Sequence, residues 1–185
     1  MDPFSKEAYD ECYLTSEKYK QHYQDLIYFV VWDYVRTKLH TTDKLLDLGC
    51  GPGHLAHLLH DFKFEHYIGI DFSKVGIQLA KHKVPRFTFI EADLRNLDYS
   101  NYSNYKFISI ETLEHLENDI ALIKKLPKNS IIFSVPNYMC IDHYRTYDSE
   151  DLIKDYYKEI LNIIKITSFP VGKESIIYVV EANIK

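Results

Sequence analysis

Short apolar runs alternate with segments of helical periodicity from Lys44 to the end of the chain. The apolar runs have the length of buried strands, and between them apolar residues recur three and four positions apart, as in amphipathic helices. Strands are expected over residues 44–48, 66–71, 87–91, 106–111, 130–135, 160–169 and 175–183. Helices are expected over residues 53–61, 73–82, 117–126 and 148–158. The alternation predicts an α/β fold with a parallel sheet and right-handed crossovers.

The part of the chain before this alternating region is rich in tyrosine. Apolar residues recur at helical spacing and predict one helix from about Tyr19 to Leu39. Tyr9, Tyr13, Tyr19 and Tyr23 form an aromatic cluster with Glu and Lys residues between them. Two interpretations stay open: the tyrosines pack on the helix with their hydroxyl groups in water, or one or two of them reach a bound ligand.

A glycine-rich stretch follows the first predicted strand. The apolar run ends in Asp47 and continues through Gly49, Gly51 and Gly53 into the next helix. Glycine permits a positive φ and lets backbone amides come close to a ligand, and Pro52 suits the first turn of the helix. Asp47 would direct its carboxylate into the same crevice. We interpret this stretch as a ligand-binding loop.

Two common nucleotide loops do not fit this stretch. The dinucleotide fingerprint has a small residue where this chain has His54. The phosphate loop of nucleoside triphosphatases needs a Gly-Lys-Ser/Thr triplet, which does not follow here.

Acidic residues end the next two predicted strands. Asp71 stands where doubly wound folds place the carboxylate that binds a ribose. Phe72 follows it, and Ser73 is a candidate N-cap for the next helix. Asp93 follows the third strand.

Together these motifs resemble the class I S-adenosylmethionine-dependent methyltransferases over nearly the whole chain. The segment Asp47–Gly53 looks like their first motif, Asp71 like their acidic loop and Asp93 like their adenine-side acid. The resemblance implies a Rossmann-like, doubly wound, seven-stranded sheet, mostly parallel with an antiparallel last strand and with helices on both faces. It implies a single methyltransferase domain over residues 1–185, in which residues 1–42 form a helical lid and residues 43–185 the core.

The resemblance also implies a cofactor, S-adenosyl-L-methionine, with S-adenosyl-L-homocysteine as the product. The glycine loop would approach the methionine portion, Asp71 the ribose hydroxyls and Asp93 the adenine amino group. The full set of residues implied for cofactor binding is Tyr23, Asp47, Gly49, Cys50, Gly51, Gly53, Asp71, Phe72, Ser73, Asp93, Leu94, Glu111 and Thr112.

The segments after the fourth and fifth strands carry the candidate chemistry. The motif Glu111-x-x-Glu114-His115 and a later Asp-His143-Tyr-Arg145 block resemble ubiquinone-biosynthesis O-methyltransferases, sugar and natural-product methyltransferases, and small-RNA 3′-terminal 2′-O-methyltransferases. A hydroxyl acceptor benefits from a general base, for which histidine is well matched near neutral pH. The catalytic candidates are His115, His143 and Glu111, and the substrate-binding candidates are Tyr13, Tyr19, Glu114, His115, His143 and Arg145.

For each of these residues a structural role stays open. His115 would tether loops, and His143 with Arg145 would anchor the 136–147 loop rather than bind an acidic substrate group. A metal is a further alternative, because Glu111, Glu114, His115 and His143 would supply mixed nitrogen and oxygen ligands. The RNA-end enzymes use such a set, but the His143 block looks more like the small-molecule enzymes. We therefore expect no metal.

Composition narrows the class of partner. The 185 residues are 46% hydrophobic and carry a net charge of −5, which indicates a globular chain without a broad nucleic-acid surface. The three cysteines include no C-x-x-C pair and are expected to be thiols in a reducing compartment. No targeting peptide or membrane-spanning run is recognised, which predicts a cytoplasmic protein, monomeric or homodimeric.

The function expected from the sequence is methyl transfer from S-adenosylmethionine to an oxygen or nitrogen of a small molecule. One alternative is a metal-dependent RNA 3′-terminal 2′-O-methyltransferase. The second alternative is a non-catalytic cofactor-binding subunit of a partner enzyme.

Overall fold

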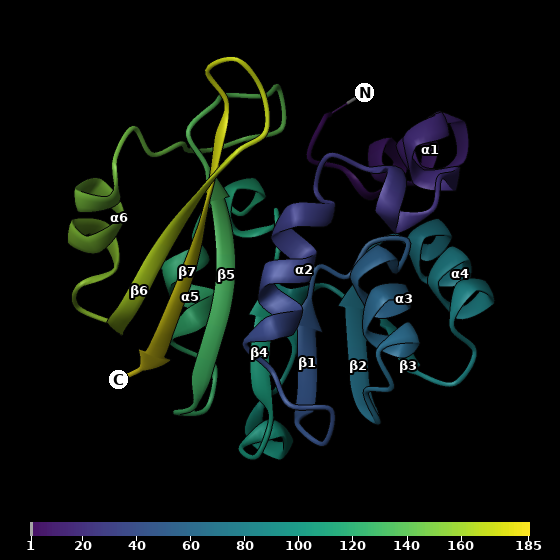
Figure 1. Ribbon diagram of the computed structural model, residues 1–185, viewed down its shortest axis with the longest axis horizontal. Helices are drawn as coiled ribbons and strands as arrows, with labels where there is room; N and C mark the ends of the chain where they lie inside the picture. Colours follow the sequence, from purple (N-terminus) through teal and green to yellow (C-terminus); the bar gives the residue numbers. More distant parts are fainter. Residues whose placement is uncertain (1) are drawn as a thin grey trace. The chain divides into compact units, whose positions relative to one another are not determined.

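The computed structural model describes residues 2–185. The chain forms two compact units, unit 1 (Met1–Leu97) and unit 2 (Asp98–Lys185), which are described separately (Figure 1). Among the described residues no helix is long and apolar enough to cross a bilayer. Cys12, Cys50 and Cys140 are free thiols, as expected.

Unit 1 contains three parallel strands in the order β3-β2-β1. They are β1 (Lys44–Leu48), β2 (His66–Asp71) and β3 (Thr88–Glu91). The helices α3 (His54–Asp61) and α4 (Lys74–Lys83) connect them, and a short 3-10 turn, η3 (Leu94–Asn96), follows β3. Every residue of β1 after Lys44 is buried, as its apolar sequence predicts. The predicted cap of α4 is confirmed, because Ser73 Oγ accepts a hydrogen bond from Gly76 N at 2.9 Å.

The N-terminal part of unit 1 is more broken than its periodicity predicts. It forms α1 (Lys6–Thr15), two 3-10 turns, η1 (Glu17–Lys20) and η2 (Tyr23–Asp25), and α2 (Phe29–Thr37). The prediction of one helix from Tyr19 to Leu39 is therefore wrong in its first half. Gln21 and Leu26 have extended backbone angles, because Tyr23 is pulled down onto α3 and buried there. Tertiary packing overrides the helical spacing at this point.

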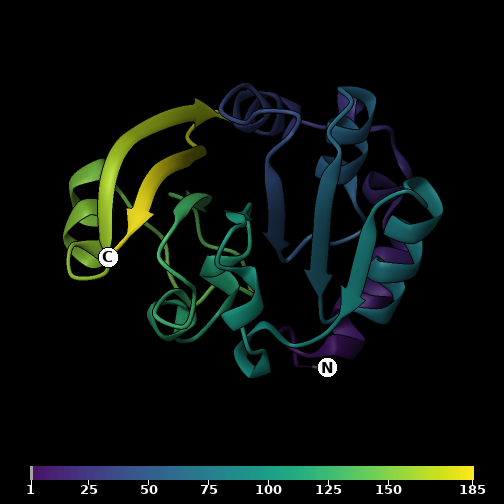
Figure 2. The ribbon, with the colours of Figure 1, turned by 90° about the horizontal axis from the view of Figure 1, so that it is seen from below.

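Helix α1 lies against α4 in unit 1, as Figure 2 shows. Asp10 of α1 fastens the contact, because its Oδ1 accepts hydrogen bonds from Ser73 Oγ at 2.5 Å and from Val75 N at 3.0 Å. Lys6 forms an ion pair with Glu91.

Unit 2 contains four strands in the order β4-β5-β7-β6. They are β4 (Lys106–Ser109), β5 (Ser130–Pro136), β6 (Leu161–Pro170) and β7 (Ile176–Ile184). Strands β4 and β5 are parallel, and β7 is antiparallel to both of its neighbours. The remaining elements are the 3-10 turns η4 (Ser100–Tyr102) and η5 (Leu113–His115) and the helices α5 (Asp119–Ile123) and α6 (Glu150–Tyr157). Figure 2 shows α6 beside β6.

The predicted fold class is confirmed: the described residues form seven strands, mostly parallel, with an antiparallel last strand. Strand bounds agree with the prediction to within two residues. The helix predicted over 117–126 is shorter, because Asn118 caps α5 by accepting from Ala121 N at 2.9 Å and the helix ends at Ile123. The single-domain description with a lid over residues 1–42 stays a prediction.

Candidate functional site

The glycine loop of unit 1 has the backbone that its sequence predicts. Gly49, Gly51 and Gly53 all have positive φ, at 85°, 49° and 80°. A Cβ atom at Gly53 would lie 2.9 Å from the Cβ of Ala80, which is closer than side chains approach. Gly49 N and Cys50 N donate hydrogen bonds to Ile70 O at 2.8 and 3.0 Å, so the loop is tied to the end of β2. The glycines are required both by conformation and by packing.

Asp71 lies at the centre of this loop system. Its Oδ2 accepts from Gly51 N and its Oδ1 from Ser73 N, both at 2.8 Å. Burial raises the pKa of this carboxyl to about 6, although hydrogen bonds from the backbone N–H groups of Ser73, Gly51 and Phe72 oppose the change. A carboxylate has about four lone-pair sites, and the three backbone donors leave one of them for a ligand. Ribose binding by Asp71 stays a prediction.

Tyr13 closes over the same loop from α1. Its hydroxyl oxygen would be 3.1 Å from a Cβ at Gly51, and its ring packs against Gly76. Burial raises the pKa of Tyr13, so the phenol stays protonated. The ring of Tyr19 packs edge-on against Tyr13 at 4.7 Å, and that of Tyr9 against Phe72 at 5.1 Å. Three of the four tyrosines, Tyr9, Tyr13 and Tyr19, thus pack at the loop or on its neighbours rather than only in water.

Three other residues predicted for the cofactor are engaged elsewhere in unit 1. Tyr23 donates to Asp61 Oδ2 at 2.8 Å, at the end of α3 away from the glycine loop. Asp47 accepts from Tyr67 at 2.5 Å, and burial raises its pKa to about 7. Asp93 caps η3 and forms a bidentate pair with Arg95, whose Nη2 lies 2.7 Å from Oδ2. An adenine amino group would have to share Asp93 with this guanidinium. Leu94, the buried neighbour of Asp93, offers only apolar contact.

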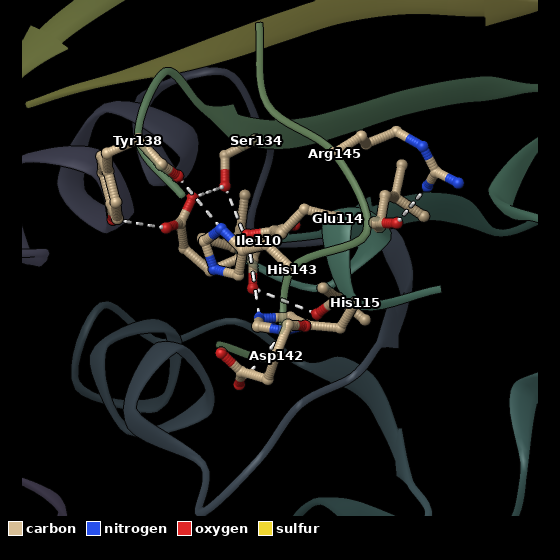
Figure 3. A network of polar contacts seen from close by, with 11 residues as sticks. Ile110, Glu114, His115, Ser134, Tyr138, Asp142, His143 and Arg145 are labelled. Atoms are coloured by element: carbon tan, nitrogen blue, oxygen red, sulfur yellow. Dashed lines mark hydrogen bonds and ion pairs between the residues drawn. The ribbon is translucent and has the colours of Figure 1, made fainter. Parts of the chain in front are cut away.

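In unit 2, Glu114 and His115 of the η5 turn lie close to His143 of the loop after β5 (Figure 3). Together with Glu111, whose charge acts on Glu114, we call these residues the acid–histidine cluster. Glu111 has a φ of 52°, which is unusual for a residue with a side chain. Its Oε1 accepts from Ser134 Oγ at 2.7 Å and its Oε2 from Tyr138 at 3.1 Å. Burial raises its pKa to about 7, against the effect of these two hydrogen bonds.

Glu114 is the most unusual residue of the cluster. Its side chain is 0% exposed, and neither carboxylate oxygen has a hydrogen-bond partner among residues 2–185. One group beside it that can carry a positive charge is His115, whose Nε2 lies 3.9 Å from Oε1. Burial, and then the charge of Glu111, raises the pKa of Glu114. An ionised carboxylate in this position is costly unless a cation joins it.

Both histidines of the cluster hold their rings by Nδ1. His115 Nδ1 donates to Asp142 O at 2.7 Å, and His143 Nδ1 donates to Tyr138 O at 3.1 Å. A carbonyl oxygen only accepts, so Nδ1 carries the proton on each ring and Nε2 presents a lone pair. The ligand atoms of Glu114, His115 and His143 lie within 4.8 Å of one another. Histidines oriented in this way are typical of metal ligands.

Arg145 stabilises the turn that carries Glu114 and His115 through contacts with backbone carbonyl groups and Asp119. Its guanidinium donates to Leu113 O at 3.1 Å and to Leu116 O at 2.6 Å, and it pairs with Asp119 Oδ1 at 3.1 Å. These contacts occupy the fork and support the anchoring role that the sequence left open. Thr112 donates locally to Ile110 O at 3.2 Å.

Sequence reasoning missed several residues that support the cluster. Asp119 is buried and accepts from Tyr157 at 2.5 Å and from Tyr156 at 2.9 Å. Ser134 and Tyr138 hold Glu111. The one available signal was a serine inside the apolar run of β5, where a polar side chain needs a partner.

Glu111 gives the stability of the metal-free protein a measurable pH dependence. Because its pKa is raised from the model-peptide value of 4.5 to about 7, the folded state binds more protons than the unfolded state between these pH values. Its contribution to stability is full below about pH 4.5 and is lost as the pH rises through about 7. In Glu111→Gln this loss disappears, so the variant should gain in Tm relative to wild type between about pH 5 and about pH 8. Thermal unfolding in the presence of a chelator measures the difference, and a constant difference would contradict the assignment.

Comparison with known proteins identifies a domain in one part of the chain. Residues 45–128 match the family described as a methyltransferase domain. Trans-aconitate 2-methyltransferase of Yersinia pseudotuberculosis serotype O:1b (strain IP 31758) is 41% identical over 96 residues, which cover 49% of this chain and 37% of that protein. The chain thus spans little more than a third of the length of this curated relative.

Solved structures share the fold at low identity. Magnesium protoporphyrin IX methyltransferase (ChlM) of Synechocystis PCC 6803, with bound SAM, has a TM-score of 0.68 at 17% identity and covers 96% of each chain. The methyltransferase domain of bacterial CtHen1-C has a TM-score of 0.58 at 23% identity and covers 82% of this chain and 94% of that one. The resemblance seen in the sequence is confirmed for residues 45–128, which match a methyltransferase domain, and the solved methyltransferases share the fold of this chain.

Proposed function

We propose that this chain is an S-adenosylmethionine-dependent O-methyltransferase in which the acid–histidine cluster binds a divalent cation. The acceptor we assign is the 2′-hydroxyl of a 3′-terminal ribose of RNA, because the motif Glu111-x-x-Glu114-His115 resembles that of the small-RNA 3′-terminal 2′-O-methyltransferases. The observation that carries the proposal is Glu114, a wholly buried carboxylate without a hydrogen-bond partner among the described residues. Its neighbours are two histidines that present Nε2 lone pairs. This geometry favours the metal-dependent alternative over the metal-free enzyme expected from the sequence.

The donor set fits a borderline or hard divalent ion such as Mn²⁺ or Mg²⁺. Glu114, His115 and His143 would hold it, since they offer one carboxylate and two imidazoles within 4.8 Å. The carbonyl groups of Asp142 and Tyr138 fix both rings, which is the support that ligating histidines require. When bound, such an ion supplies a Lewis acid that orients vicinal hydroxyls and lowers their pKa.

The residues of the chain would then divide the remaining work. Backbone amides of the glycine loop bind the methionine portion of the cofactor, and Asp71 accepts from its ribose hydroxyls. Glu111, with a pKa of about 7, takes the proton of the acceptor hydroxyl, because a general base works best with a pKa near the working pH. The acceptor oxygen forms a bond to the methyl carbon as the bond from carbon to sulfur breaks, and S-adenosylhomocysteine leaves. Positioning supplies most of the rate, since the sulfonium is already an activated donor.

Chelation tests the proposal directly. Methyl incorporation into a short RNA should disappear after dialysis against EDTA and return with Mn²⁺ or Mg²⁺. The matched control is the same RNA with a 2′-deoxy nucleotide at its 3′ end, which should accept no methyl group. Chelator-insensitive turnover, or equal methylation of the deoxy control, would overturn the proposal.

A small-molecule acceptor is the second candidate. Two observations favour it: the net charge of −5, which opposes a polyanion, and the similarity to a trans-aconitate methyltransferase. This candidate predicts methylation of a hydroxyl or carboxylate metabolite that persists in EDTA. A non-catalytic subunit, by contrast, would bind S-adenosylhomocysteine but turn over neither class of substrate.

A further inference from the structure

A second group of metal-ligating side chains lies in unit 1, away from the glycine loop. It consists of His22, His57 and Asp61, and we call it the histidine–aspartate clip. His57 and Asp61 are four residues apart on α3 and therefore share one face of the helix. His22 immediately precedes η2 and comes from a different segment. One ligand atom from each residue lies within 4.8 Å of the others.

The surroundings of the clip resemble those of a metal site. Tyr23 donates to Asp61 Oδ2 at 2.8 Å and so orients the carboxylate. The rings of His22 and His57 meet edge to face with centroids 5.0 Å apart. His57 Nε2 lies 3.9 Å from Asp61 Oδ2, and His60 Nδ1 lies 3.6 Å from Asp61 Oδ1. His60 thus lies beside Asp61 without belonging to the group of three ligand atoms.

We propose that the histidine–aspartate clip binds Zn²⁺ and thereby fastens residues 21–25 to α3. Two imidazoles and one carboxylate match the ligand types and the number that zinc takes when a water or a further side chain fills the fourth position. Metal binding would cost His22 one hydrogen bond, the 3.3 Å contact in which Gln24 N donates to Nδ1. A neutral imidazole that binds a metal through one nitrogen carries its proton on the second nitrogen, so Nδ1 can no longer accept this bond.

The clip has a structural consequence for the N-terminal segment. Residues 21–25 follow η1, where Lys18 and Lys20 are exposed. Tyr19, between them, packs on Tyr13 over the glycine loop. A metal that joins His22 to α3 holds the chain directly after these residues. It should therefore slow every local opening that separates the segment from unit 1.

Zinc binding and proteolysis together test the inference in the full chain without a histidine tag. Zn²⁺ alone should slow tryptic cleavage after Lys18 and Lys20 about tenfold at a free concentration ten times the dissociation constant, because binding suppresses the open state in that ratio. Isothermal titration should lose one zinc equivalent in His57→Ala and in His22→Ala. The matched control is His66→Ala, which removes an exposed imidazole from the same unit and should leave both readouts unchanged.

Zinc binding at the acid–histidine cluster is separated from binding at the clip with a second variant. His143→Ala takes a ligand from the acid–histidine cluster, and in that background the clip should still bind one zinc ion and protect both lysines. The inference is overturned if His57→Ala and His22→Ala bind as much zinc as His66→Ala. It is equally overturned if bound zinc leaves the cleavage rate unchanged. Methyl transfer measured without zinc should be the same in His22→Ala and wild type, which separates this result from the proposed function.

Discussion

Glu114→Met is expected to stabilise the metal-free protein and to abolish methyl transfer. A buried polar group without a hydrogen bond costs about 1–3 kcal/mol, and methionine fills a similar volume without that cost. At this chain length about 1 kcal/mol shifts Tm by roughly 2–4 °C, so the variant should melt several degrees higher in EDTA. Activity should fall at least about 100-fold, because loss of residues that merely orient metal ligands already costs 10–100-fold.

The control for this variant is Glu117→Met, two residues after the same turn and at an exposed position. It should change the free energy of unfolding by less than about 0.5 kcal/mol and leave turnover intact. Differential scanning calorimetry and methyl incorporation measure the two effects. A Glu114→Met protein that melts lower than wild type, or that remains active, would remove the basis for the metal assignment.

Asp71→Asn is expected to weaken cofactor binding roughly 100-fold. Hydrogen bonds to a charged acceptor contribute about 1.5–3 kcal/mol each, and the ribose offers two hydroxyls. In the wild-type protein Gly51 N and Ser73 N each donate to an oxygen of Asp71. The asparagine side chain has an NH₂ group in place of one of these oxygens, so one of the two backbone N–H groups loses its acceptor. Titration calorimetry with S-adenosylhomocysteine measures the affinity, and circular dichroism confirms that the variant is folded.

The carboxylate charge gives this prediction a second readout. Because the pKa of Asp71 is about 6, wild-type affinity should decline as the pH falls below that value, whereas the affinity of Asp71→Asn should not. Glu65→Gln, an exposed acid of the same unit, serves as the control and should bind as wild type does. Unchanged affinity in Asp71→Asn would show that the ribose is bound elsewhere.

Local signals predicted the core of the fold well. The strand β1 and the glycine loop combine a continuous apolar run with residues whose φ values only glycine adopts easily, so local chemistry and tertiary packing agree there. The helix expected from Tyr19 failed because the decisive contact, Tyr23 on Asp61, joins segments that are distant in sequence. Periodicity carries no information about such a contact.

The candidate site was predicted only in part for the same reason. The residue types of Glu111, Glu114 and His115 were visible in the sequence, and their proximity to His143 was one of the alternatives. The burial of Glu114 and the occupation of Arg145 by backbone carbonyls were not visible. Both depend on how the loop after β5 folds back on the turn after β4, and a single sequence does not encode that geometry in any local pattern.

The close packing of Tyr13 on Gly76 links two positions that are far apart in the chain. A Cβ atom at position 76 would lie 3.0 Å from the ring of Tyr13. Each position therefore limits which residues the other accepts, and substitutions at the two sites should not be additive. A variant library that randomises α4 while keeping Tyr13 should recover almost only glycine at position 76. Larger residues should return once position 13 is allowed to become small.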